Sequence, residues 1–217
     1  MSASHTHAVL IDQLGTQLRP VRRLPPPSRR ALGWLLVVLA IAGALSMHYG
    51  LGGMLHRFAG APDLKWAGIG ASLTAITAAW AAFSLGVPGR PARWAWLPLP
   101  AALLWIGASG MGCLRHWVAP GMSISDAHQS LDCLYFIVSF SVPLSVLLIV
   151  MLRRACPLRP VLTAVMIGLA SASASASLLE ICHAFDAAAT DLLIHAAAVG
   201  VVVAINAAMG GRLLTRT

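Results

Sequence analysis

The cysteine side chains are the groups in this chain with the most distinctive chemistry. There are four of them, Cys113, Cys133, Cys156 and Cys182. A thiol can be oxidised and paired as a disulfide, and a thiolate can bind a metal ion. No two are spaced as Cys-x-x-Cys, which argues against a quinone-linked disulfide oxidase. Cysteines that serve only as small apolar residues at helix ends are the structural alternative.

The composition indicates that a membrane must hold these thiols in place. The chain has 217 residues, of which 58% are hydrophobic and 10% are charged, and its mean hydropathy is +0.79. These values lie outside the range of soluble domains. The formal net charge of +8 would favour a nucleic-acid partner in a soluble protein, but in a membrane protein basic residues mainly set orientation. We therefore expect an integral membrane protein that binds no nucleic acid directly.

Six apolar runs are each long enough for a helix to cross about 30 Å of hydrocarbon, which takes about 20 residues. The predicted fold is therefore an all-α bundle of six transmembrane helices. Pro98 and Pro100 lie in the first half of the third run, and Pro143 lies inside the fourth. Such kinks are tolerated where neighbouring helices satisfy the freed carbonyls. The predicted spans are residues 31–52, 66–87, 94–112, 131–152, 159–179 and 190–210.

The basic residues predict the orientation of this bundle, because Lys and Arg stay on the cytoplasmic side of short loops. Of the 15 Lys and Arg residues, all but Arg57, Lys65 and Arg115 precede the first span, follow the last, or lie in the second and fourth loops. Both termini are therefore expected in the cytoplasm, with residues 1–30 as a cytoplasmic tail on a membrane domain of residues 31–217.

This orientation divides the cysteines between two compartments. Cys156 lies in a loop with Arg153 and Arg154 and faces the reducing cytoplasm. Cys113, Cys133 and Cys182 lie at the external ends of the third, fourth and fifth spans. The external thiols are thus the candidates for redox chemistry.

The cytoplasmic tail carries one apolar stripe. Leu10, Leu14 and Leu18 recur every four residues, with Val9 and Ile11 beside them, which predicts a short amphipathic helix. A helix of this length is marginal alone and is expected to fold on a partner. A protein partner is favoured over the alternative, an anionic lipid surface.

The predicted tail helix has a start and a stop in the sequence. Ser4 or Thr6 could cap its N-terminus, and Arg19-Pro20 ends it. Pro25-Pro26-Pro27 then forms a stiff spacer that holds the helix away from the bilayer.

Acidic and histidine side chains gather in the external loops and at their edges. Glu180, His183 and Asp186 are the candidates for a metal site, but their spacing matches no fixed ligand pattern such as HExxH. Polar residues that keep loops in water are the favoured interpretation. No firm metal site and no cofactor is expected.

Several motifs together resemble one family, the NrsF-like membrane anti-sigma factors of proteobacteria. The resemblance covers nearly the whole chain and is specific as a set. Its motifs are Pro20-Val21-Arg22-Arg23-Leu24 with Arg29-Arg30, Val87-Pro88-Gly89-Arg90, Gly112-Cys113-Leu114, Leu131-Asp132-Cys133-Leu134, Met151-Leu152-Arg153-Arg154, Pro157-Leu158-Arg159-Pro160, and Cys182 to Asp186 with His195.

The resemblance implies a six-span protein of the bacterial inner membrane whose tail restrains an extracytoplasmic-function (ECF) sigma factor. It implies no catalysis. It also implies that a periplasmic cysteine pair, here Cys133 and Cys182, senses oxidative or metal stress, with Cys113 as a competitor for either role. The tail residues expected to bind the sigma factor are Leu10, Ile11, Leu14, Leu18, Arg22 and Arg23.

The direction of each helix assigns unequal roles to this pair. The fourth span enters from the periplasm, so Cys133 is expected in a first turn, where the helix dipole favours thiolate, although Asp132 opposes this. Cys182 is expected at a carbonyl end beside Glu180, which disfavours thiolate. Cys133 should therefore react first with an oxidant and Cys182 should resolve it to a disulfide.

Two other functional classes remain open from the residues. A periplasm-facing thiol oxidoreductase would turn over a substrate and would not need the tail. A heavy-metal sensor or carrier would use the cysteines with Glu180 and His183. Deletion of residues 1–30 separates both from a regulator, which alone would lose its function.

Overall fold

The structure, a computed structural model, describes residues 2–16, 24–118, 127–155, 157–182 and 189–214. In this part of the chain all regular elements are helices. They are α1 (Ser2–Thr16), α2 (Pro27–Tyr49), α3 (Gly52–Gly60), α4 (Pro62–Leu85), η1 (Ala92–Trp96), α5 (Leu99–Val118), α6 (Ala127–Leu152), η2 (Arg153–Ala155), α7 (Pro160–Cys182) and α8 (Ala189–Leu214).

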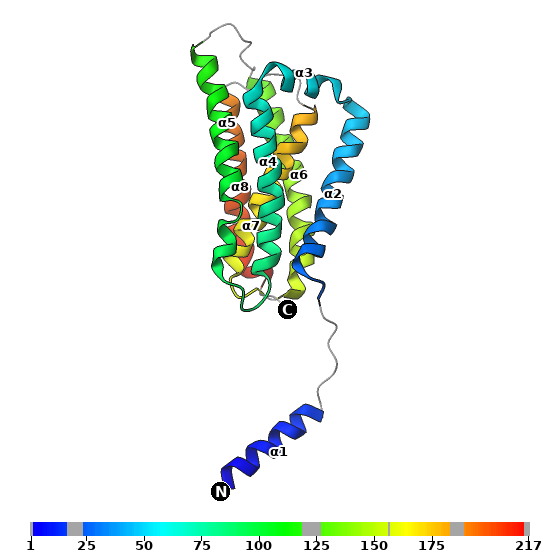
Figure 1. Ribbon diagram of the computed structural model, residues 1–217, viewed down its shortest axis with the longest axis vertical. Coiled ribbons are helices and arrows are strands. Elements are labelled where there is room, and N and C mark those ends of the chain that lie inside the picture. The colour runs from blue at the N-terminus through cyan, green and yellow to red at the C-terminus, as the bar shows by residue number, and fades with distance from the viewer. Residues whose placement is uncertain (1, 17–23, 119–126, 156, 183–188, 215–217) are drawn as a thin grey trace.

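The six long helices α2, α4, α5, α6, α7 and α8 run side by side as one bundle (Figure 1). Among the described residues, five helical segments are long and apolar enough to cross a membrane, and α5 is not among them. The five are Pro27–Tyr49, Pro62–Leu85, Leu131–Ala155, Pro160–Cys182 and His195–Leu214. The predicted all-α membrane protein is confirmed to this extent.

The outer surface of the bundle is apolar. Leu39, Leu103, Ile106, Val146 and Val150 are each more than half exposed. Exposed large apolar side chains over so much surface are unfavourable in water but suit a surface that faces lipid tails. Polar side chains such as Ser and Thr are instead found among the buried residues.

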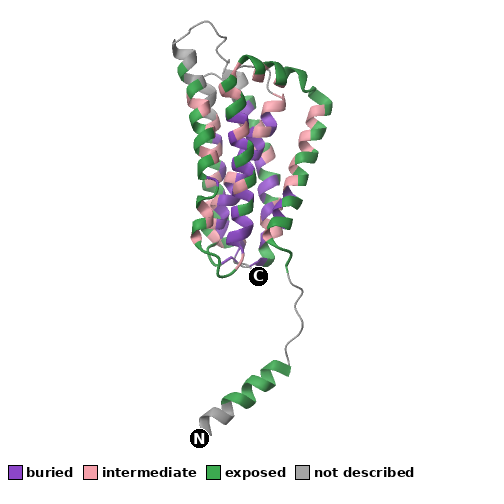
Figure 2. Cartoon of the chain, in the orientation of Figure 1, coloured by how far each residue is buried: buried purple, intermediate pink, exposed green. Residues whose placement is uncertain are grey.

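Small residues bring α4 and α7 together at the centre of the bundle, where the buried residues concentrate (Figure 2). The alternating run from Ala170 to Ser177 is helical, as predicted, and almost all of it is buried. Its hydroxyls bond back one turn: Ser173 Oγ donates to the Leu169 carbonyl at 2.6 Å and Ser175 Oγ to the Ser171 carbonyl at 2.8 Å. The buried Ser171 Oγ is the exception, with no hydrogen-bond partner among the described residues, and the small side chains let the backbones approach closely.

The third predicted span is displaced in the structure. Residues 92–96 form the short helix η1, and α5 begins only at Leu99, where a span of 94–112 was expected. The cause is the two prolines: Pro98 and Pro100 lack an N–H, and proline is best accommodated at a helix start. The Pro98 carbonyl accepts the first hydrogen bond of α5, from Ala102 N at 2.9 Å.

A short helix, α3, was not predicted. It lies across the end of the bundle between α2 and α4 (Figure 1) and contains no buried residue. Gly50, at φ 76°, ends α2 and turns the chain toward it. A left-handed backbone of this kind favours glycine, so the turn is set by the sequence even though the helix after it is too short to show in hydropathy.

Candidate functional site

The tail contains the predicted helix, but the helix begins earlier than expected. α1 already runs from Ser2, so neither Ser4 nor Thr6 is its N-cap. Leu10, Ile11 and Leu14 are 51%, 69% and 56% exposed, and Figure 1 shows α1 apart from the bundle. Leu18, Arg22 and Arg23 lie outside the described residues.

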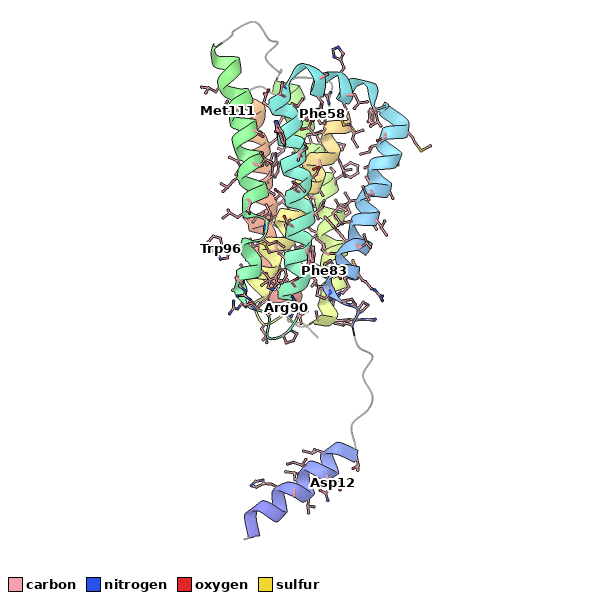
Figure 3. All side chains as sticks on the ribbon, viewed as in Figure 1. Asp12, Phe58, Phe83, Arg90, Trp96 and Met111 are labelled. Carbon is pink, nitrogen blue, oxygen red and sulfur yellow. The ribbon has the colours of Figure 1, made fainter. Side chains whose placement is uncertain are left out.

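The charge of α1 makes a lipid surface a poor partner for it. The first Lys or Arg in the sequence is Arg19, beyond the end of the helix, and its one acidic residue, Asp12, is exposed (Figure 3). Helices that lie on anionic membranes carry Lys and Arg along their polar face. An apolar stripe without such residues fits a groove on another protein better.

The last residues of the tail are extended. Leu24, Pro25 and Pro26 are exposed and non-helical, and Pro26 has φ −59° and ψ 151°, the polyproline conformation. Pro27 then starts α2, since proline is well suited to the first helical turn. The polyproline conformation expected of the spacer is thus found at Pro26, whereas Pro27, its predicted third residue, belongs to α2.

The root of the tail is held against the bundle by two side chains that were not among the predicted site residues, Arg30 and Trp34. Arg30 is only 7% exposed. Its Nη2 donates to the Met151 carbonyl in the last turn of α6, and its Cζ lies 4.8 Å from the centroid of the Phe83 ring. Trp34 is fully buried, and its Nε1 donates to the Leu144 carbonyl at 3.2 Å.

Sequence spacing holds a signal for this pair. Arg30 and Trp34 are four residues apart, so they share one face of a helix. Their burial, together with that of Ala31, accounts for every buried residue of α2. A guanidinium on helix-end carbonyls and on an aromatic face is also favourable electrostatically.

The predicted thiol pair is at the opposite end of the bundle, where α6 begins and α7 ends. Cys133 is 4% exposed and packs in one cluster with Ile137, Leu179 and Ala198. Leu179 is three residues before Cys182, the last residue of α7. Neither cysteine forms a disulfide in the structure, and the cluster joins the start of α6 to the last turn of α7, which ends at Cys182.

The expected first-turn position of Cys133 is wrong. α6 begins at Ala127, so Cys133 lies in the second turn, beyond the amides that lack intrahelical partners. The dipole argument for its thiolate is lost with that position. Cys182 is the more accessible thiol, and its Sγ lies 3.9 Å from the Leu178 carbonyl.

Arg57 of α3 reaches the end of α7 beside Cys182. Its Nη2 donates to the backbone carbonyl of Glu180 at 2.6 Å, and its charge also acts on the Glu180 carboxyl group. Its Nε is buried and has no hydrogen-bond partner among the described residues. A guanidinium there satisfies carbonyls that a helix end leaves free and complements the helix dipole.

For three other predicted site residues, the structure gives no side-chain position. His183 and Asp186 lie outside the described residues, and the side chain of Cys113 is not described. Within the described part of the chain, no group of three or more His, Cys, Asp or Glu residues is arranged to hold a metal ion.

Comparison with known proteins gives one match. The model of a family described as "Negative regulator of sigma F" (NrsF) matches residues 14–215. The match therefore begins inside α1 and covers all the helices of the bundle. No curated protein and no solved structure matches the chain.

Proposed function

The chain belongs to the NrsF family, the negative regulators of sigma F, and on that premise we propose that it is a membrane-bound anti-sigma factor that sequesters an ECF sigma factor. Its residues 1–30 hold the sigma factor away from RNA polymerase. Sequestration requires only binding, so the protein needs no catalytic group for it.

One observation carries this proposal: an apolar helix face stands exposed on a separate element at the end of a proline spacer. Leu10, Ile11 and Leu14 of α1 are each at least half exposed. An isolated helix of 15 residues is marginal in water, and burial of its apolar stripe in a partner's groove supplies the missing stability.

The proposed topology is six spans in the inner membrane of a bacterium, with both termini in the cytoplasm. α5 supplies the sixth span, since it is 20 residues long and packs along α4. The start of α2 and the end of α8 lie at one end of the bundle (Figure 1). Most of the Lys and Arg residues lie in segments at that end, as expected of a cytoplasmic side.

Reporter fusions test this topology. A reporter that works only in the periplasm should be active when fused after Pro62, Met122 or Asp186, and inactive after Arg90, Cys156 or Thr217, because the basic segments stay in the cytoplasm. An active reporter after Thr217 would contradict an even number of spans and would exchange the compartments of the cysteines.

The proposed signal input is the pair Cys133 and Cys182. The α6–α7 end that carries both lies away from the tail (Figure 1), and in the proposed topology it faces the oxidising periplasm. Oxidation of the pair, or its capture by a thiophilic metal ion, changes the packing of α6 on α7 and leads to release of the sigma factor.

A thiol oxidoreductase is the weaker candidate. Such an enzyme presents an accessible, low-pKa thiol to its substrate, whereas Cys133 is 4% exposed and no Cys-x-x-Cys exists in the sequence. A heavy-metal carrier that uses the cysteines with Glu180 and His183 would be independent of the tail.

Deletion of residues 1–30 therefore tests the proposed function. We expect genes that depend on the partner sigma factor to become fully active in cells that carry the truncated protein, without any stress. The measurement is transcription of those genes, with the membrane level of the truncated protein as the control. Repression that survives the deletion at normal protein levels would contradict the proposal.

A further inference from the structure

We propose that Arg30 and Trp34 are positioning residues that link the tail to α6, so that a change at the thiol end of α6 is transmitted to the tail. This inference rests on the proposed function, because it explains how a thiol signal crosses the membrane. The main observation is that α6 contains Cys133 near one end and, in its other half, the two carbonyls that accept these hydrogen bonds, those of Met151 and Leu144.

The link is made at the only buried part of α2. Arg30, Ala31 and Trp34 are its buried residues, whereas Leu36, Leu39 and Met47 farther along are 56%, 63% and 91% exposed. The first two turns are thus the most deeply buried part of α2, although partly buried residues farther along, such as Val38 and Ile41, also pack against the core. The spacer of the tail leaves directly from these first turns. Any displacement of these turns changes where the tail begins.

α6 can carry a displacement over the necessary distance. The 18 residues from Cys133 to Met151 correspond to about 27 Å of helix at 1.5 Å per residue. Pro143 lies inside the helix and is a natural place for a bend. The carbonyl of the next residue, Leu144, is the one that Trp34 binds, so Trp34 holds α6 next to the place where a bend is expected.

The side-chain hydrogen bonds that join α6 to α7 and α8 are made by groups that can adjust to a small shift. Ser141 Oγ donates to Ser175 Oγ of α7 at 3.1 Å, and Asn206 Nδ2 of α8 donates to Ser145 Oγ at 3.2 Å. Hydroxyl groups rotate and exchange partners readily. The charged contact of Arg30, by contrast, is directional and stronger than a bond between neutral groups, so a shift of α6 at Met151 acts directly on the start of α2, which also packs against α4 and α7.

Amide hydrogen exchange tests the link on the full-length protein in lipid nanodiscs. Cys113→Ser and Cys156→Ser are introduced throughout, so that Cys133 and Cys182 are the only thiols. Exchange is followed in peptides covering residues 28–36, before and after diamide. Diamide accepts two electrons and two protons from the two thiols as their disulfide forms.

We expect Arg30→Gln to raise the exchange rate of these amides roughly tenfold to hundredfold, the effect of losing a charged hydrogen bond, and to abolish any further change on diamide. Trp34→Phe keeps the ring but loses the N–H, and should raise exchange roughly twofold to tenfold. It serves as the second variant where Arg30→Gln fails to reach the membrane. Arg153→Gln, at an exposed arginine beside the same end of α6, should leave both the rate and the response unchanged.

The outcomes separate the link from the proposed function. The link would be overturned if the amides of Arg30→Gln exchanged at the same rate as those of the parent protein. It would also be overturned if diamide changed their exchange as much as in the parent. Loss of the response in Arg57→Gln but not in Arg30→Gln would overturn it too, because the signal would then pass through α3. No diamide response in the parent protein would instead contradict the thiol input itself, and with it the link.

Discussion

Replacement of Leu10 and Leu14 by aspartate should abolish binding of the sigma factor to the tail. Both side chains are about half exposed in the free protein and lie on one face of α1, four residues apart. Each buries apolar surface in the complex that is worth about 1.5–3 kcal/mol, or about a tenfold to hundredfold change in affinity. The measurement is titration of the sigma factor against the membrane protein in nanodiscs.

Val9 lies next to the apolar stripe in the sequence but away from it around the helix, so it provides a matched control. It is an apolar residue of similar exposure, 56%, but at 3.6 residues per turn it points about 100–160° away from Leu10, Ile11 and Leu14. Val9→Asp should leave the affinity within a few-fold of the parent. Tight binding by the Leu10→Asp and Leu14→Asp double variant would reject the apolar stripe as the binding surface. Equal loss in Val9→Asp would show that any negative charge on α1 is harmful.

Mild oxidation should form a disulfide between Cys133 and Cys182, and Cys182→Ser should abolish the transcriptional response to oxidant. The two thiols are at neighbouring helix ends, and Cys133 belongs to the same apolar cluster as Leu179, which lies less than one turn before Cys182. Because Cys133 is 4% exposed and Cys182 is not buried, the oxidant should now meet Cys182 first, the reverse of the order expected from the sequence. Peptide mapping by mass spectrometry after differential alkylation identifies the bridge.

The single variants provide the comparison for this prediction. Sigma-dependent transcription in cells that carry Cys133→Ser or Cys182→Ser should stay at its unstressed level after oxidant, whereas Cys156→Ser should respond as the parent does. A bridge from Cys113 to Cys133, or release of the sigma factor in Cys182→Ser, would reject this pair as the sensor. Formation of the bridge also requires that the two Cα atoms approach within about 7 Å.

Hydropathy predicted the long helices well but did not predict where they end. The run that starts at Leu131 marks the hydrocarbon, whereas α6 begins at Ala127, because a helix continues through polar residues beyond the membrane as long as its backbone bonds are made. This difference of one turn moved Cys133 out of the expected first turn. In the third span the error had another cause, since Pro98 and Pro100 shifted the start of the helix.

The hydrogen bonds between helices could not be predicted from the sequence. Arg30 contributed to the predicted orientation through its charge, yet the partner of its guanidinium is the Met151 carbonyl, which is remote in sequence. Every residue has a backbone carbonyl, so the sequence does not show which one will accept a given hydrogen bond. The same holds for Arg57 and the Glu180 carbonyl. The apolar stripe of α1, by contrast, is a local feature, and its helix was predicted from spacing alone.

Co-purification tests the central claim, that this membrane protein holds a sigma factor by its tail. The full-length protein and a version that lacks residues 1–30 are purified from their native membrane in a mild detergent, and the proteins bound to each are identified by mass spectrometry. We predict one sigma factor in comparable amount to the full-length protein and none with the truncated version. Equal recovery of a sigma factor with both versions, or recovery with neither, would contradict the claim.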